Sequence, residues 1–158
     1  MKQFATFHLN EYYFGLNVLL VREVNKSIDI TPVDGALPFI KGLMNLRGLI
    51  VTVLDPGEKL SLGSREVTEE TRCVVLKTDS EVDRIRATGV DLERTYPDLV
   101  GLLVDRIGDM VNVEDDDIEA PPANSGGVDG KYIEGIVKLE NDLLIVLNVT
   151  ELLGGETE

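Results

Sequence analysis

Two segments far apart in the chain carry the same pattern of apolar residues around a glycine. Residues 39–55 and 132–148 align without a gap, so that Gly42 matches Gly135, and in both an aromatic residue and an isoleucine precede the glycine. Each segment consists of two short apolar runs joined by a polar turn, which predicts a β-hairpin. A duplication of this kind limits the fold to two similar β units.

A second match aligns residues 19–24 with residues 102–107 and equates Val21 with Val104. Each copy would then consist of a strand, a polar connection, a segment that contains proline and, last, a hairpin. The prediction is two small β-barrels of one design, which should pack on one another because each alone buries little surface. The competing interpretation is that any two hairpins rich in valine and leucine look alike.

The rest of the chain also consists of short apolar runs separated by Gly, Pro, Asn and Asp, which is typical of an all-β barrel or sandwich. Besides the two hairpins, strands are predicted over residues 4–9, 13–18, 19–23, 73–76 and 99–107, with residues 110–113 and 118 paired around an acidic run. Residues 79–98 are predicted to be an exposed charged excursion with one helical turn, residues 123–130 a loop, and residues 149–153 a final helical turn ended by Gly154-Gly155.

Composition excludes several classes of function. The 158 residues include 15 Lys+Arg and 29 Asp+Glu, and a formal net charge of −14 argues against a nucleic-acid or membrane-surface partner. No apolar run is long enough to span a bilayer, and residues 1–20 lack a signal-peptide pattern, so we expect a cytoplasmic setting. A single cysteine excludes an intrachain disulfide and a zinc site built from thiolates.

Few residues are candidates for catalysis. His8 stands alone in an alternating strand, and Cys73, at the start of an apolar run, is expected to be a small buried hydrophobe. The acidic run 114–117 lacks the ligand spacing and central glycine of a calcium loop, so a solvated turn is the simpler interpretation. The sequence indicates a binding module without catalytic residues, cofactor or metal, and the alternative is a metal-dependent or acid–base enzyme that uses this run.

Arg47-Gly48 forms the tip of the first hairpin, whereas Glu140-Asn141 occupies the tip of the second. Gly48 can supply the positive φ of a tight turn, and an arginine beside it is presented to solvent. The planar guanidinium suits a carboxylate or backbone carbonyls on a partner. The alternative roles of Arg47 are solubility or a local ion pair with Glu23 or Asp55.

Five motifs follow one another along almost the whole chain. They are residues 7–16, Val21-Arg22-Glu23-Val24, the approach 31–42 to Asn45-Leu46-Arg47-Gly48, Val100-Gly101-Leu102-Leu103-Val104-Asp105, and Tyr132-Ile133-Glu134-Gly135 with the final leucine-rich hairpin. Through these motifs the chain closely resembles the chemotaxis coupling (adaptor) protein family CheW.

The resemblance implies a single CheW-like domain over residues 1–158, made of two SH3-like five-stranded β-barrels packed together, with short helical segments at connections and at the C-terminus. It implies no catalysis and no cofactor. It implies an adaptor that couples transmembrane chemoreceptors to a CheA-type histidine kinase. The receptor's cytoplasmic signalling tip would bind in a groove between the barrels, and the kinase's regulatory domain would bind at barrel ends.

The resemblance also implies a set of receptor-binding residues and a location. The residues are Val21, Glu23, Gly42, Asn45, Arg47, Gly48 and Gly101. Arg47 is expected to pair with a carboxylate of the receptor tip, and the protein is expected to be recruited to membrane receptor arrays without inserting into the membrane. The same fold in another chemosensory pathway, such as type IV pilus or gliding motility, stays an open alternative.

Overall fold

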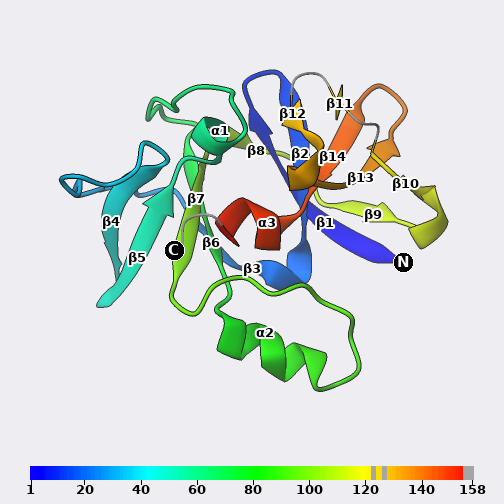
Figure 1. The fold of residues 1–158 in the computed structure, drawn as a ribbon, viewed down its shortest axis with the longest axis horizontal. Helices are drawn as coiled ribbons and strands as arrows, with labels where there is room; N and C mark the ends of the chain where they lie inside the picture. The colour runs from blue at the N-terminus through cyan, green and yellow to red at the C-terminus, as the bar shows by residue number, and fades with distance from the viewer. Residues whose placement is uncertain (122–123, 126–127, 155–158) are drawn as a thin grey trace.

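The strands fall into two large sheets, which confirms the all-β prediction. The computed structural model describes residues 1–121, 124–125 and 128–154, and these residues form a seven-stranded sheet, a five-stranded sheet and a separate pair of strands (Figure 1). Only short helical segments occur among them, at the connections and near the end of the chain.

The sheets are assembled from segments that are not contiguous in the chain. The seven-stranded sheet holds β1 (Lys2–Leu9), β2 (Tyr12–Asn17), β8 (Arg106–Ile107), β9 (Val111–Val113), β10 (Ile118–Glu119), β13 (Ile133–Lys138) and β14 (Leu143–Leu147). The five-stranded sheet, in the order β3-β6-β7-β5-β4, holds β3 (Val21–Asn25), β4 (Ile40–Leu46), β5 (Leu49–Leu54), β6 (Arg72–Leu76) and β7 (Val100–Val104). The other elements are η1 (Val18–Leu20), α1 (Pro56–Lys59), α2 (Asp79–Arg86), η2 (Asp115–Asp117), β11 (Asn124–Ser125), β12 (Val128–Asp129), η3 (Gly130–Tyr132) and α3 (Val149–Gly154).

The duplicated hairpins, β4–β5 and β13–β14, have the same register, as their alignment predicts. Gly42 pairs with Val53 in the first, Gly135 pairs with Val146 in the second, and the register shifts just before each glycine. The second strand of each hairpin then pairs in parallel with another strand, β5 with β7 and β14 with β2. The two sheets are therefore variants of one design.

The other half of the duplication was aligned wrongly. In the structure, Gly101 of β7 pairs with Val53 as Gly15 of β2 pairs with Val146, so β7 corresponds to β2. Val104 lies at the end of β7, whereas Val21 begins β3, so the two valines are not equivalent. Apolar composition is alike in all these strands, and backbone pairing rather than composition fixes the correspondence.

Three apolar clusters explain why the central strands are apolar on both faces. One cluster lies within the five-stranded sheet and includes Cys73, Val75 and Leu103, and another lies within the seven-stranded sheet. The largest draws residues from both sheets. Successive side chains of a strand point to opposite faces. In β6, Cys73 and Val75 therefore point into the cluster of the five-stranded sheet, whereas Val74 and Leu76 point toward the other sheet.

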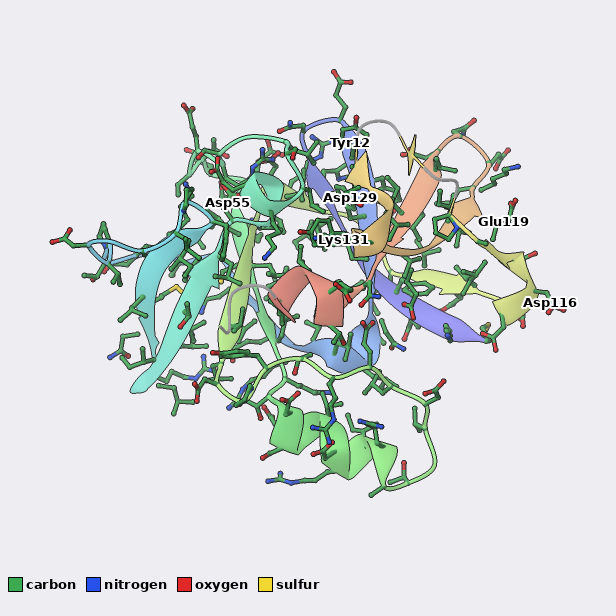
Figure 2. The ribbon with its side chains drawn as sticks, in the orientation of Figure 1. Tyr12, Asp55, Asp116, Glu119, Asp129 and Lys131 are labelled. Carbon is green, nitrogen blue, oxygen red and sulfur yellow. The ribbon has the colours of Figure 1, made fainter. Side chains whose placement is uncertain are left out.

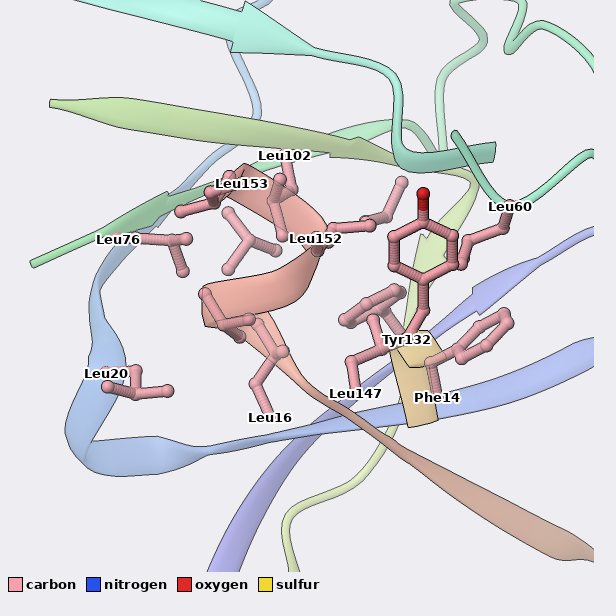
Figure 3. Close-up of a cluster of buried hydrophobic side chains, with 14 of the residues drawn as sticks. Phe14, Leu16, Leu20, Leu60, Leu76, Leu102, Tyr132, Leu147, Leu152 and Leu153 are labelled. Carbon is pink, nitrogen blue, oxygen red and sulfur yellow. The ribbon is translucent and has the colours of Figure 1, made fainter. Parts of the chain in front are cut away.

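The C-terminal helix α3 completes the core between the sheets. Val149, Leu152 and Leu153 are at most 2% exposed and belong to the shared cluster. Figure 3 shows Leu152 and Leu153 beside Leu102 of β7, with Leu147 of β14 close to the same cluster. The helix therefore fills space that neither sheet fills alone, as expected for two small β units that stabilise each other.

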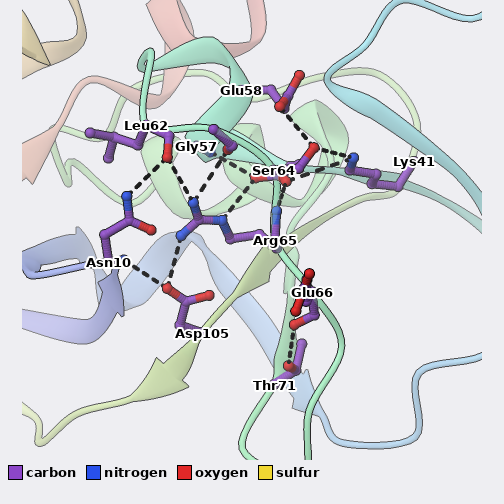
Figure 4. A network of polar contacts seen from close by, with 12 residues as sticks. Asn10, Lys41, Gly57, Glu58, Leu62, Ser64, Arg65, Glu66, Thr71 and Asp105 are labelled. Carbon is purple, nitrogen blue, oxygen red and sulfur yellow. Dashed lines mark hydrogen bonds and ion pairs between the residues drawn. The ribbon is translucent and has the colours of Figure 1, made fainter.

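A buried arginine joins three connections where the sheets meet (Figure 4). The Arg65 side chain, in the loop after α1, is 2% exposed, and its Nη1 donates to Asp105 Oδ2 at 2.8 Å. Asp105 lies between β7 and β8 and also accepts the Asn10 N–H, in the β1–β2 turn, at 2.7 Å. Arg65 Nη2 donates to the Leu62 carbonyl at 3.2 Å. These contacts join a turn of one sheet to a loop of the other.

Asp55 is the buried carboxylate of this network. Its Oδ1 accepts the Gly57 N–H at 2.9 Å and its Oδ2 accepts the Arg65 N–H at 2.5 Å, while Arg65 Nε lies 3.5 Å from Oδ1. Burial raises the pKa of Asp55, and the contacts with Arg65 and Gly57 and the charge of Lys41 oppose the shift. Because the carboxylate is paired and bonded, its burial is tolerated.

Three strand predictions were wrong in detail. Residues 18–20 form the 3₁₀ turn η1 rather than the end of one strand and the start of the next, because Asn17 accepts the Leu19 N–H and caps the turn. The run 99–107 contains β7 and β8, which belong to different sheets. β9 and β10 do not pair with each other but with β1 and β13.

The predicted loop 123–130 contains the β11–β12 pair, and residues 123, 126, 127 and 155 lie outside the described part.

The charged excursion is more ordered and more buried than the sequence predicts. It begins with α2, which has a capping box: Thr78 accepts the Glu81 N–H, and Glu81 accepts the Thr78 N–H. Val82 and Leu92 are buried in the shared core. The Thr-x-x-Glu spacing is a helix-start signal that the charge pattern obscured.

Because the two sheets share a core, we predict that they unfold together. The extent of the domain itself stays a separate prediction. Native-state hydrogen exchange should give the slowest amides of β6 and of β14 the same free energy of opening, because each sheet needs the cluster that both supply. Two different global values, one for each sheet, would contradict this prediction.

Candidate functional site

Arg47 and Gly48 form the two-residue turn between β4 and β5. Their φ angles are +51° and +88°, and positive φ at both positions is the mark of a type I′ hairpin turn. Glycine adopts such a φ readily, whereas a residue with a Cβ seldom does. The side chain of Asn45 holds the turn closed, because its Oδ1 accepts the Gly48 N–H at 2.9 Å. Asn45 is thus part of the turn's structure as well as its surface.

Arg47 forms an ion pair with Glu23 of β3. Arg47 Nη1 donates to Glu23 Oε1 at 3.2 Å, and Nη2 also contacts Oε2, so the pair is bidentate. The hydrogen bond and the charge of Glu23 raise the pKa of Arg47. Because β3 and β4 are at opposite ends of the strand order, the pair requires the five-stranded sheet to curl on itself.

The ion pair leaves Arg47 accessible. Its side chain is 66% exposed, and that of Glu23 is 25% exposed. Of the two local partners considered from the sequence, Glu23 is the one found, since Asp55 is buried against Arg65. A screened surface pair of this kind adds little to stability. The guanidinium is therefore held in place and still able to contact another protein.

Exposed aliphatic side chains lie beside this turn. Leu43 is 37% and Ile50 is 57% exposed, whereas Met44 and Leu46 between them in the hairpin are buried. Ile50 pairs with Asn45, so the two share the outer face. We call the following residues the turn surface: Glu23, Leu43, Asn45, Arg47, Gly48 and Ile50. Apolar area beside an arginine is typical of protein-docking surfaces.

The remaining predicted receptor-binding residues are partly or fully buried. Val21 is partly buried and packs against the shared core. Gly42 and Gly101 are buried. A Cβ on Gly42 would lie 2.1 Å from the Thr31 carbonyl oxygen, and one on Gly101 would lie 2.4 Å from Cys73 Sγ. Both glycines permit close packing, so an effect of either on binding would be indirect.

Leu43 and Ile50 of the turn surface are not among the residues predicted from the sequence. With Met44 and Leu46 assigned to the core, the two-residue period of a strand places Leu43 and Asn45 on the outer face. The sequence alone leaves open which aliphatic residues of a hairpin face outward, because both strands are apolar.

The candidates for catalysis, His8 and the acidic run 114–117, lie in different surroundings. The His8 ring stacks on Tyr13 at 4.7 Å between centroids, and burial and then the charge of Arg106 lower its pKa. The acidic run forms the exposed turn η2, where Asp116 points away from the molecule (Figure 2). Within the described ranges, no three His, Cys, Asp or Glu side chains are grouped so as to hold a metal ion.

Cys73 is predicted to be unreactive in the folded protein. Burial, and secondarily the charge of Glu23, raise the pKa of its thiol to about 12. The thiolate is the reactive form, so at pH 8 reaction with a disulfide reagent should be at least roughly a thousandfold slower than in denaturant. Prompt stoichiometric labelling of the folded protein would contradict the prediction.

Comparison with known proteins gives the same family along nearly the whole chain. The CheW-like domain family matches residues 3–156. The chemotaxis protein CheW of Bacillus subtilis (strain 168) is 29% identical over 157 residues, which cover 99% of this chain and 89% of that protein. CheW of Treponema pallidum (strain Nichols) is 27% identical over 154 residues, covering 98% of this chain and 83% of that protein.

A solved structure supports the same assignment. The crystal structure of the scaffolding protein TtCheW from Thermoanaerobacter tengcongensis superposes with a TM-score of 0.79 at 26% identity, covering 96% of this chain and 87% of that chain. This likeness confirms the prediction of two SH3-like β-barrels packed together. Among the described residues, none of the helices combines the length and the hydrophobicity that a bilayer span requires. The chain therefore belongs to the CheW-like family, as a chemotaxis scaffold protein without catalytic activity.

Proposed function

We propose that this protein couples chemoreceptors to a CheA-type histidine kinase, and that the turn surface contacts the receptor's cytoplasmic signalling tip. The observation that carries the proposal is the Arg47 guanidinium, which is fixed by Glu23 yet 66% exposed on a strained turn. A helical tip that offers a carboxylate would complement the guanidinium, and its apolar side chains would cover Leu43 and Ile50.

The residues of the proposed receptor site divide into contacts and supports. Glu23, Asn45, Arg47 and Gly48 are exposed or partly exposed and are proposed as contacts. Val21 supports β3 from the shared core, while Gly42 and Gly101 keep the hairpin and β7 closely packed. Most of the binding energy would come from a few central groups of this surface, of which Arg47 is the first candidate.

The kinase is the second proposed partner, through its regulatory domain. This part of the proposal is supported by membership of the CheW-like family and by the two-barrel fold. The protein would act in the cytoplasm and be recruited to receptor arrays at the membrane by binding. A role in another chemosensory pathway, such as type IV pilus or gliding motility, would use the same surfaces with a different receptor and kinase.

Two separate titrations test the proposal. A receptor signalling-tip hairpin and a kinase regulatory domain are each titrated into the labelled full chain, and both are expected to bind. Receptor affinity should fall with added salt, because the proposed pair involves an exposed guanidinium. Absence of binding by either partner at high micromolar concentration would contradict the proposed function.

A further inference from the structure

The carboxylate of Glu93 joins the charged excursion to the C-terminal helix α3. The backbone N–H groups of Val149 and Thr150 donate to the same oxygen, Glu93 Oε2, at 2.9 and 3.3 Å. The Thr150 hydroxyl donates to the carbonyl of Arg94 at 2.6 Å. Two adjacent residues of the excursion are thus bonded to the first two residues of the helix.

The helix held by this contact lies in the core that the two sheets share. Val149, Leu152 and Leu153 are buried there, together with Leu92 from the excursion itself. A loss of the Glu93 contact would therefore loosen the packing between the sheets rather than a surface segment alone.

The surroundings of Glu93 favour its protonated form. Glu93 lines a pocket of about 120 Å³ with Lys2 of β1, Glu134 of β13 and Asp91 of the excursion. The uncharged lining residues are Phe4, Asn17 and Leu92. The lining thus contains one cation and three carboxylates, of which Glu93 is partly buried and the others are exposed. Burial, and then the charge of Glu134, raise the pKa of Glu93 to about 7, while the N–H groups of Thr150 and Val149 and the charge of Lys2 oppose the shift.

We propose that the contact of Glu93 with the start of α3 is a pH-dependent latch, which holds α3 most firmly at acidic pH and releases it more readily as the pH rises. An exposed glutamate titrates near 4.5, so the closed latch binds its proton more tightly than the open one. Proton linkage then makes opening more favourable as the pH rises from about 4.5 to about 7, with no further gain well above 7.

Amide hydrogen exchange of the full chain tests the latch. Between pH 5 and pH 8, the protection factors of the Val149, Thr150 and Leu152 amides should fall by roughly ten- to a hundredfold in the wild type, after correction for base catalysis. In E93Q, which keeps the acceptor oxygen and removes the charge, they should change little over the same range. E134Q should give a smaller fall with a lower midpoint.

Two further measurements make the outcome unambiguous. E151Q removes an exposed carboxylate of the same helix, and its protection factors should fall as in the wild type. In the wild type, the Glu93 side-chain carboxyl carbon should titrate near pH 7 by NMR, which does not depend on any variant folding. A Glu93 midpoint near 4.5, or an equal fall in E93Q and wild type, would overturn the proposal.

Discussion

Replacing Arg47 with glutamate is expected to weaken binding of the receptor tip by at least about tenfold while the fold is retained. The substitution removes the exposed cation and places a second carboxylate beside Glu23, so the turn surface would repel an acidic partner. The hairpin itself loses little, because the Arg47–Glu23 pair is exposed and surface pairs contribute weakly to stability. Titration and thermal melting measure the two effects separately.

A matched control for Arg47→Glu is Arg86→Glu. Arg86 lies on α2, is 42% exposed and forms an ion pair with Asp83 at 3.8 Å, so it loses the same kind of contact away from the turn surface. Its receptor affinity should equal that of the wild type. If Arg47→Glu unfolds the protein, Arg47 is a structural residue. If it folds and binds as the wild type does, the proposed contact is absent.

Replacing Gly42 with valine is expected to cost at least about 4 kcal/mol, a large part of the about 5–15 kcal/mol that stabilises a typical domain. Gly42 has a φ of +146°, which disfavours any side chain, and its Cβ would lie 2.1 Å from the Thr31 carbonyl oxygen. That oxygen accepts the Leu43 N–H at 2.9 Å, so relieving the clash would also break the pairing of Thr31 with β4. Urea unfolding measures the loss.

The control for Gly42→Val is Gly48→Val. Gly48 also has a positive φ, +88°, but nothing lies within 4 Å of its added Cβ. This variant isolates backbone strain, of roughly 1–3 kcal/mol, from the clash. Equal losses for the two variants would show that close packing at Gly42 does not matter.

The sequence predicts the hairpins better than it predicts their partners. The alignment of Gly42 with Gly135 gives the correct register because hairpin pairing is local and the turn fixes it. The equivalence of Val21 and Val104 fails because it depends on which distant strand lies alongside. Short apolar strands with two buried faces carry no period that distinguishes one neighbour from another.

Part of the candidate site can also be predicted from the sequence, because that part depends on local structure. Gly48 and the presentation of Arg47 follow from turn chemistry, which is local. The choice of Glu23 as partner depends on the curl of the five-stranded sheet, which brings β3 to the hairpin tip. The role of Glu93 depends on contact with a helix that lies far along the chain, and the surrounding charges suggested only a solvated segment.

The claim that the turn surface receives the receptor is tested most directly by backbone amide NMR of the full chain during titration with the receptor tip. The amides of residues 45–48 and 23, with those of Leu43 and Ile50, should show the largest shifts, and Arg47→Glu should abolish them at the same tip concentration. Shifts centred elsewhere, for example on η2 and β10, with residues 43–50 unchanged, would contradict the account.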